Sequence, residues 1–296
     1  MKVGFIGVGN MGGPMCRNII RKSGEQVIVF DLNADAIKVC TDLGATAAKS
    51  VAELVAASDV VMTSLPMPKD VEAVALGPGG ILESGRKGLV YFDLSTNSPT
   101  VAKRIHERMQ EKGIIMLDAP VSGGVTGAEA GTIAIMVGGD KATFDKYTPL
   151  LQSFGANVLH LGVVGSGCIA KLINNMLSFC NMTAAAEGLV LGTMAGLDGT
   201  MLEKVVSNSS GNSNAFRNLA SKGLNRNFKT QFALDLAYKD LRLCLELAEE
   251  CGVPMMMGPQ VLNMMRMARA AGWGQADSSS VLRVYENVMT HEIKSS

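Results

Sequence analysis

Short apolar runs alternate with longer amphipathic stretches from the start of the chain to about Gly162. Apolar runs bounded by turn residues are typical of buried strands, and apolar residues recurring every three or four positions are typical of helices. The predicted strands cover residues 2–7, 26–30, 59–64, 89–94, 114–118, 132–137 and 157–161. Helical stretches, such as 99–112 and 141–154, lie between them. This alternation favours a parallel α/β sheet.

The pattern changes at residues 162–167, where the strand signals stop. Residues 168–194 are continuously helical in pattern, which corresponds to a helix of about 40 Å at 1.5 Å per residue. Further helices are predicted over residues 201–209, 234–251, 260–271 and 280–290. We therefore expect a Rossmann-type, doubly wound α/β domain over residues 1–163 and an all-α substrate and oligomerisation domain over residues 164–296. The long helix joins them without a flexible linker, which predicts a well-formed cleft between the domains.

A glycine-rich turn follows the first predicted strand directly. Its residues are Gly7, Val8, Gly9, Asn10, Met11 and Gly12, and a helical stretch begins at Gly13. In G-x-G-x-x-G the first glycine allows a tight turn, the second lets the backbone approach phosphates, and the third lets the helix pack against the strand. The helix N-terminus adds free N–H groups and partial positive charge. This order of elements predicts a site for a dinucleotide pyrophosphate.

The second predicted strand ends at Asp31, about 20 residues beyond the glycines, where a carboxylate can accept hydrogen bonds from the adenosine ribose hydroxyls. A carboxylate also repels a 2′-phosphate, and the next residues, Leu32 and Asn33, include no arginine to receive one. The sequence therefore favours NAD over NADP. An alternative is that Asp31 only caps the following helix.

Composition narrows the partners and the location. The chain has 296 residues, 47% of them hydrophobic and 18% charged, and a formal net charge of zero. No block of lysines or arginines suggests nucleic acid or an anionic membrane as a partner. Six cysteines without C-x-x-C or metal-ligand spacing predict a reducing, cytoplasmic location and no metal site. The apolar stretch 176–197 contains polar residues and three glycines, so we interpret it as a buried helix rather than a membrane span.

Loops after the predicted strands carry further candidates, because ligands of doubly wound sheets bind beyond the carboxyl ends of the strands. Leu65, Pro66 and Asp70 are candidates for the adenosine side of the cofactor, and Thr96 for the nicotinamide ribose or carboxamide. Turn formation and helix capping explain these segments almost as well. Ser122, Gly123 and Gly124 form a turn whose backbone N–H groups can hold a carboxylate, although an ordinary glycine loop is an equal alternative.

The long predicted helix begins at Gly165-Ser166-Gly167 and carries Lys171, Asn174 and Asn175. Positions i, i+3 and i+4 share one face of a helix, so an ammonium group and two amides project together. Lysines usually lie on solvated faces. Here the neighbouring residues are mostly apolar, which favours a polar site in a cleft.

Taken together, these segments resemble the β-hydroxyacid dehydrogenase family, which includes 3-hydroxyisobutyrate dehydrogenases. The resemblance covers nearly the whole chain and depends on four motifs in order, at residues 4–12, 118–124, 165–175 and 239–241. It implies that Lys171 is the catalytic lysine, that Ser122, Gly123, Gly124 and Asn175 hold the substrate, and that Lys239 closes over the nicotinamide end of NAD. Homodimers or homotetramers are common in this family.

The resemblance implies reversible hydride transfer between NAD and a small 3-hydroxy acid, with a small carboxylate as substrate. The second half is most similar to the 2-(hydroxymethyl)glutarate dehydrogenase branch, through residues 209–211, 227–228, 232–236 and 239–241. Most 3-hydroxyisobutyrate enzymes carry aromatic residues soon after Ser-Ser-Gly, whereas this chain has Asn212-Ser213-Asn214-Ala215-Phe216-Arg217 there, so the substrate stays open. Arg217, Lys222, Arg226 and Lys229 are candidates for a second substrate carboxylate, or are surface charges. The alternatives are an NADPH-dependent semialdehyde reductase, an imine reductase or a non-catalytic, cofactor-bound interaction module.

Overall fold

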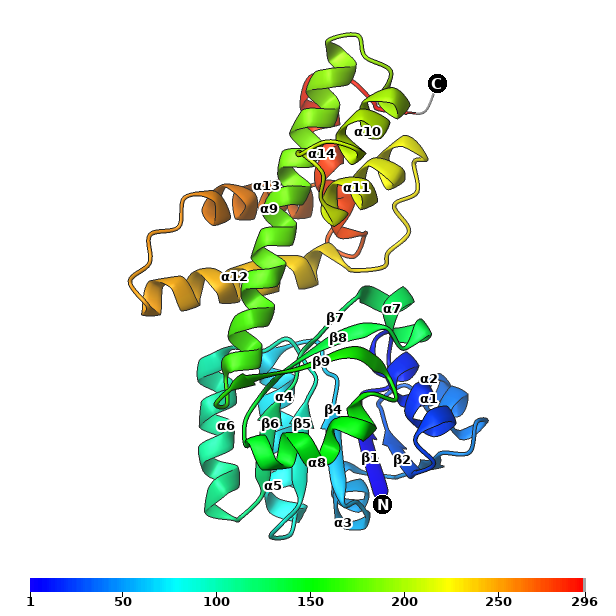
Figure 1. Ribbon diagram of the computed structural model, residues 1–296, viewed down its shortest axis with the longest axis vertical. Helices are drawn as coiled ribbons and strands as arrows, with labels where there is room; N and C mark the ends of the chain where they lie inside the picture. The colour runs from blue at the N-terminus through cyan, green and yellow to red at the C-terminus, as the bar shows by residue number, and fades with distance from the viewer. Residues whose placement is uncertain (295–296) are drawn as a thin grey trace. The chain divides into compact units, whose positions relative to one another are not determined.

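The computed structural model describes residues 1–294. It confirms the expected fold class, a Rossmann-type α/β sheet followed by helices. Two compact units are formed, Met1–Lys171 and Leu172–Ser296. Both are drawn in Figure 1.

The first unit contains a nine-stranded sheet in the order β3-β2-β1-β4-β5-β6-β8-β7, with β9 paired to β8. The strands are β1 (Lys2–Ile6), β2 (Gln26–Phe30), β3 (Thr46–Ala47), β4 (Val60–Thr63), β5 (Val90–Asp93), β6 (Ile115–Asp118), β7 (Val121–Ser122), β8 (Ile133–Gly138) and β9 (Gly155–Gly162). From β3 to β6 all neighbours are parallel. The chain moves outward from β1 to β3 and then returns to β4, so the switch point of the sheet lies between β1 and β4.

The far end of the sheet departs from the predicted parallel arrangement, because β8 runs antiparallel to both β6 and β7. A parallel pair needs a crossover of a dozen or more residues, usually a helix packed on the sheet. Only the short helix α7 (Gly124–Ala130) separates β7 from β8, so an antiparallel return is the accessible pairing. The two-residue strands β3 and β7 were too short to be seen in the hydrophobic pattern.

Helices cover both faces of the sheet (Figure 1). They are α1 (Gly12–Lys22), α2 (Ala34–Thr41), α3 (Val51–Ala57), α4 (Pro68–Leu76), α5 (Ile81–Ser84), α6 (Pro99–Glu111), α7 and α8 (Lys141–Leu151). One core cluster joins Phe5 and Phe92 to α1, α2 and α8, and a second joins Ile6 and Tyr91 to α3, α4, α5 and α6. Strands buried on both faces are apolar at nearly every position, which explains why they were predictable from short apolar runs.

The second unit is built from helices around one core. They are the greater part of α9 (Ser166–Met194), then α10 (Gly199–Ser207), α11 (Asn214–Leu224), α12 (Leu234–Glu250), α13 (Met257–Ala270), a 3₁₀ turn (Ser278–Ser280) and α14 (Val281–Met289). Phe179, Leu189 and Leu241 lie in the core. Helix α11 was not predicted, because its first turn is rich in polar residues. Ser213 caps it by accepting a hydrogen bond from the Phe216 N–H at 3.0 Å.

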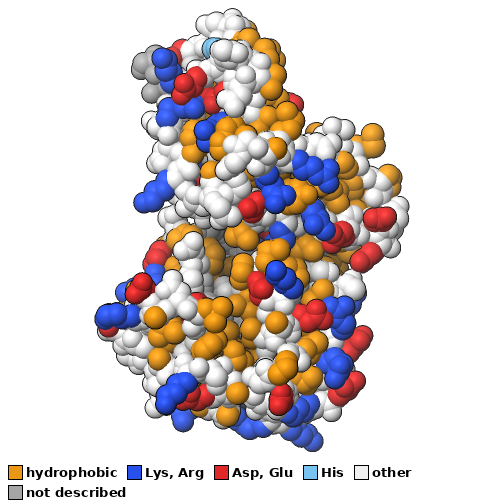
Figure 2. Space-filling model, turned by 180° about the vertical axis from the view of Figure 1, so that it is seen from behind, with side chains coloured by type: hydrophobic (Ala, Val, Ile, Leu, Met, Phe, Trp, Pro, Cys, Tyr) orange, Lys and Arg blue, Asp and Glu red, His pale blue; other side chains and the backbone are white. Residues whose placement is uncertain are grey.

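Charged side chains of both signs are interspersed on the face of the molecule shown in Figure 2. Apolar side chains gather between them, so this face carries no extended region of a single charge. Within residues 1–294, no helix combines the length and hydropathy needed to cross a membrane.

Candidate active site

Two glycines of the turn between β1 and α1 are required by the packing of the protein itself. Gly7 has a φ of 88°, and a Cβ there would lie 2.4 Å from the carbonyl oxygen of Ser64. At Gly12 a Cβ would lie 1.9 Å from the carbonyl oxygen of Gly7. A side chain at Gly7 would push the loop after β4 away from the turn, and a side chain at Gly12 would push helix α1 away from it.

Gly9 differs, because a Cβ at this position would meet nothing within 4 Å. The protein's own packing therefore does not require glycine here, whereas close approach of a ligand to the backbone does. Helix α1 begins without a side-chain cap at Met11 and without an acidic residue in its first turn. The Gly13 N–H donates to the Gly9 carbonyl at 2.8 Å and Pro14 has no N–H, so the helix offers an anion chiefly the Gly12 N–H and the positive end of its dipole. The residues present fit the pyrophosphate of a dinucleotide.

Asp31 follows β2 and is joined to the glycine turn. One carboxylate oxygen accepts a hydrogen bond from the Val8 N–H at 2.7 Å, and the other from the Asn33 N–H at 2.8 Å. A carboxylate offers about four acceptor positions, so these two bonds leave room for ribose hydroxyls. Helix α2 is capped by Asn33 rather than by Asp31. Helix capping therefore does not account for Asp31.

The loops after β4 and β5 are organised by a buried acid that sequence reasoning missed. Asp93, the last residue of β5, accepts hydrogen bonds from the Ser95 N–H at 3.0 Å and from the Asn97 amide at 3.1 Å. Burial raises the pKa of the Asp93 carboxyl, although these hydrogen bonds oppose the rise. The Ser95 hydroxyl in turn accepts from the Leu65 N–H at 2.9 Å. Asp93 thus fixes the segment that carries Thr96 and ties it to Leu65.

The other candidates near these loops have simpler surroundings. Pro66 is exposed and Thr96 is partly buried. Asp70 lies in the first turn of α4, where a carboxylate interacts favourably with the helix dipole. Its favourable position at the start of a helix therefore explains Asp70 without a bound ligand.

The Ser-Gly-Gly turn lies between β7 and α7. Gly123 and Gly124 have φ angles of 141° and 65°, values that favour glycine. A Cβ at Gly123 would lie 2.8 Å from the side chain of Ile133, but a Cβ at Gly124 would meet nothing within 4 Å. The backbone at Gly124 therefore borders open space. Ser122 ends β7 and is partly buried.

The start of α9 is fixed by a second acid that sequence reasoning missed. Asp118, the last residue of β6, is fully buried. Its carboxylate accepts hydrogen bonds from the Gly165 N–H at 2.7 Å and the Cys168 N–H at 2.8 Å. Burial raises the pKa of this carboxyl, against the effect of both bonds. Asp118 therefore caps α9 from a distant strand, one helical turn before Lys171. Asp93 and Asp118 are both acidic residues at the end of an apolar strand, and this pattern could have identified them from the sequence.

Lys171 is 8% exposed, a value reached by few lysines. It projects from α9 together with Asn174 and Asn175, three and four positions later. The Asn174 amide donates a hydrogen bond to the Asn175 side-chain oxygen at 3.1 Å. This bond joins the two asparagines, of which Asn174 is exposed and Asn175 buried, and a common site with Lys171 stays a prediction.

Helix α12 joins the two asparagines to a predicted cofactor residue. The Asn175 amide donates to the Asp240 carboxylate at 2.6 Å, and the Lys239 ammonium lies 3.1 Å from the other oxygen of that carboxylate. Asn175 and Asp240 are 7% and 2% exposed. The second unit therefore brings Asn174, Asn175 and Lys239 into one network through Asp240, which had no assigned role.

Two of the four cations considered for a second substrate carboxylate are engaged within the fold. Lys222 forms an ion pair with Asp277 at 2.7 Å, and Arg226 forms ion pairs with two glutamates of the same unit. Arg217 and Lys229 are exposed.

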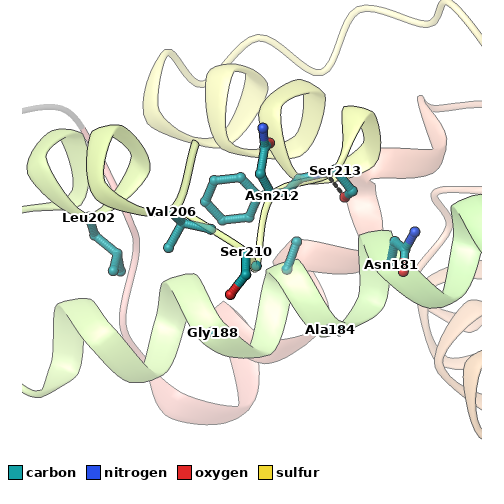
Figure 3. Close-up of a pocket in the computed structure, with 11 residues that line it drawn as sticks. Asn181, Ala184, Gly188, Leu202, Val206, Ser210, Asn212 and Ser213 are labelled. Atoms are coloured by element: carbon teal, nitrogen blue, oxygen red, sulfur yellow. Dashed lines mark hydrogen bonds between the residues drawn. The ribbon is translucent and has the colours of Figure 1, made fainter. Parts of the chain in front are cut away.

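A pocket of about 420 Å³ lies elsewhere in the second unit, between α9, α10 and the loop before α11. Figure 3 shows Ala184 and Gly188 on α9 beside Ser210 of that loop, and Asn181 further along α9, nearer to Ser213. Every side chain that lines it is uncharged. In the part of the chain that the structure describes, no group of three or more His, Cys, Asp or Glu residues is placed to hold a metal ion.

Models of dehydrogenase families match both halves of the chain. Residues 2–162 match the model of the NAD binding domain of 6-phosphogluconate dehydrogenase. Residues 165–285 match the model described as NAD-binding of NADP-dependent 3-hydroxyisobutyrate dehydrogenase.

Individual relatives match nearly end to end. The chain is 41% identical to 2-(hydroxymethyl)glutarate dehydrogenase of Eubacterium barkeri, over 97% of this chain and 96% of that protein. It is 36% identical to NAD-dependent L-serine dehydrogenase of Pseudomonas aeruginosa, over 96% and 98%. The crystal structure of 3-hydroxyisobutyrate dehydrogenase from Salmonella typhimurium superposes with a TM-score of 0.88 at 30% identity, covering 96% of this chain and 99% of that one. The chain therefore belongs to the β-hydroxyacid dehydrogenase family of NAD-binding oxidoreductases, which act on the CH–OH group of their substrates.

Proposed function

We propose that the protein catalyses reversible hydride transfer between NAD and a small 3-hydroxy acid of the 3-hydroxyisobutyrate or 2-(hydroxymethyl)glutarate type, with Lys171 as the acid and base. The observation that carries this proposal is a lysine only 8% exposed, on the same helix face as two amides. The domains that we assign are residues 1–163 for the dinucleotide and 164–296 for substrate binding and oligomerisation. The cytoplasmic location expected from the sequence stays a prediction that cell fractionation can test.

Oxidation of an alcohol requires that the hydroxyl proton leaves as the hydride leaves. Bound NAD supplies the hydride acceptor. Lys171 takes the proton in oxidation and returns it in reduction. A free lysine has a pKa near 10.4 and is a poor base at neutral pH, but burial disfavours the charged ammonium form. Low exposure of the Lys171 side chain therefore supports this role.

Substrate binding in this proposal uses uncharged donors. The backbone N–H groups of Ser122, Gly123 and Gly124 hold the carboxylate, and Asn174 and Asn175 hold the reacting oxygen. Orientation of this kind is a large part of catalysis, because it converts an encounter between two molecules into a reaction within one complex.

The reaction class is tested by a screen of hydroxy acids with NAD, followed through the absorbance of the reduced cofactor. The panel contains 3-hydroxyisobutyrate, 2-(hydroxymethyl)glutarate and L-serine, each with its semialdehyde or 3-oxo partner where this is stable. We expect oxidation of at least one 3-hydroxy acid. Turnover confined to semialdehydes with NADPH would instead support the alternative, an NADPH-dependent semialdehyde reductase.

We expect the variant Asp31→Ala to weaken NAD binding and to narrow the preference for NAD over NADP. Hydrogen bonds to a charged group contribute roughly 1.5–3 kcal/mol, so kcat/KM for NAD should fall on the order of 10- to 100-fold. The value for NADP should fall less, because a charge that repels the 2′-phosphate is removed as well. Steady-state kinetics with both cofactors measure this difference.

A matched control is Asp35→Ala, which removes a neighbouring exposed acid in the first turn of α2. Its kinetics with both cofactors should stay close to those of the wild type. An unchanged ratio of the two kcat/KM values in Asp31→Ala would refute the ribose assignment.

We also propose that the protein is a homo-oligomer that associates through the exposed face of α9. Exposed positions on this helix include Ile173, Leu177 and Leu191, the last being 72% exposed. The exposed positions of α9 outside the proposed substrate site and the pocket described above are Ile173, Leu177, Ser178, Glu187, Leu191 and Met194. This face of α9 is about 30 Å long and carries a single charged residue, Glu187. So few charges are unusual for a helix face that contacts only solvent.

The variant Leu191→Glu should dissociate the oligomer, because a carboxylate would be buried without a partner in a symmetric interface. Light scattering after size-exclusion chromatography gives the mass. The control Met256→Glu changes an 80% exposed residue outside α9 and should leave the mass unchanged. An unaltered mass for Leu191→Glu would contradict this interface.

A further inference from the structure

Asp240 is a buried carboxylate whose contacts differ from those of other buried acids in the same unit. Within residues 1–294, it contacts the side chains of Asn175 and Lys239. Asp277, by contrast, accepts hydrogen bonds from the backbone N–H groups of Gln231, Phe232 and Ser279. Asp277 therefore organises the backbone of the fold, whereas Asp240 holds two side chains of the proposed active site.

The chemistry of the carboxylate determines how the Asn175 amide is turned. A carboxylate only accepts hydrogen bonds, so the NH₂ group of Asn175 must face Asp240, at the observed 2.6 Å. The side-chain oxygen then faces the other way, where it accepts from the Asn174 amide at 3.1 Å. An amide nitrogen has two hydrogens, and one of them remains after the bond to Asp240 is made.

We propose that Asp240 is a positioning residue, which orients the side-chain amide of Asn175 so that its second N–H is presented to the reacting oxygen of the substrate. This rests on the proposed function, in which Asn175 holds that oxygen. Lys239 lies 3.1 Å from the second carboxylate oxygen and compensates the buried negative charge. The ion pair of Asp240 and Lys239 therefore keeps a hydrogen-bond acceptor at a fixed place beside Asn175, and the negative charge of Asp240 is not isolated.

An amide in place of the carboxylate removes this control. In Asp240→Asn the new side chain presents either an oxygen or an NH₂ group to Asn175, so both orientations of Asn175 become accessible. In one of them the side-chain oxygen of Asn175 faces the substrate and cannot donate. Displacement of a catalytic contact by about 1 Å can reduce the rate on the order of 100-fold.

Steady-state kinetics of Asp240→Asn with the best substrate from the screen test the proposal. We expect kcat to fall on the order of 100-fold. Asp240→Glu retains an acceptor-only group and should recover part of the lost turnover. Asp277→Asn is the matched control, a buried aspartate of the same unit, and should lower Tm while kcat at low temperature stays near wild type.

A second measurement does not depend on turnover. The short hydrogen bond to a carboxylate should shift one side-chain amide proton of Asn175 downfield in the ¹H–¹⁵N spectrum, and Asp240→Asn should abolish this shift. Unchanged amide signals in Asp240→Asn would overturn the proposal, as would a lost shift with unchanged kcat. A fall in Tm with kcat near the wild-type value at low temperature, as expected for Asp277→Asn, would reduce Asp240 to a structural role. If the wild-type protein oxidises no hydroxy acid, the proposed function fails, and the amide signals still decide whether Asp240 orients Asn175.

Discussion

The variant Lys171→Met should lose on the order of 1000-fold in kcat, because general acid–base catalysis contributes about 10²- to 10⁴-fold and methionine cannot exchange a proton. The apolar side chain has a similar length, so packing around the 8% exposed position should be retained. Affinity for NAD should change little, since Lys171 is not among the predicted cofactor contacts. Calorimetric titration with NAD and single-turnover kinetics separate the two effects.

Lys171→Arg provides the sharper comparison. It keeps the positive charge, but a guanidinium is not deprotonated at accessible pH and so cannot act as a base. We expect it to be as inactive as Lys171→Met. Small primary amines added to Lys171→Ala should restore part of the turnover. Retention of more than a few percent of wild-type activity in Lys171→Arg would mean that charge alone is needed and that the proton moves by another route.

The variant Asp118→Ala should cause a large loss of stability. Two buried backbone N–H groups, those of Gly165 and Cys168, would lose their acceptor. Each unsatisfied group costs about 1–3 kcal/mol. A total of about 2–6 kcal/mol lowers Tm by roughly 4–24 °C in a domain of this size. Turnover should fall too, because Lys171 lies one helical turn after Cys168.

A graded series distinguishes capping from a general packing defect. Asp118→Asn retains one acceptor oxygen and should lose about half as much stability as Asp118→Ala. Asp59 also accepts a backbone hydrogen bond, from the Lys2 N–H at 2.9 Å, but at an exposed site. Asp59→Ala should therefore leave Tm nearly unchanged. Equal Tm values for Asp118→Ala and the wild type, measured by differential scanning calorimetry, would disprove the capping role.

The cofactor half of the site was largely predictable, because its signals are local. The glycine turn joins consecutive elements, and Gly9 and Gly12 are distinguished by position within one short motif. Asp31 lies close enough in sequence for spacing to place it beside the turn, and its bond to the Val8 N–H agrees with that placement. What the motif did not reveal is that, of its three glycines, Gly9 is the one that faces open space.

The acids that organise the rest of the site were not predictable in the same way. Asp118 caps a helix by accepting from a backbone N–H 47 residues later, and Asp240 holds an asparagine 65 residues earlier. Nothing in the periodicity of either segment indicates its partner. Both residues could have been marked as acids within apolar stretches, but not assigned to a contact.

The order of elements, the glycine turn, the two-part organisation and the shared face of Lys171, Asn174 and Asn175 follow from the sequence alone, because hydrophobic periodicity and residue spacing act over one or two helical turns. Tertiary structure decided the antiparallel pairing of β8 and the partners of Asp93, Asp118 and Asp240. A buried carboxylate must find donors wherever folding brings them, and long-range contacts of this kind are set by the packing of whole elements rather than by any local pattern.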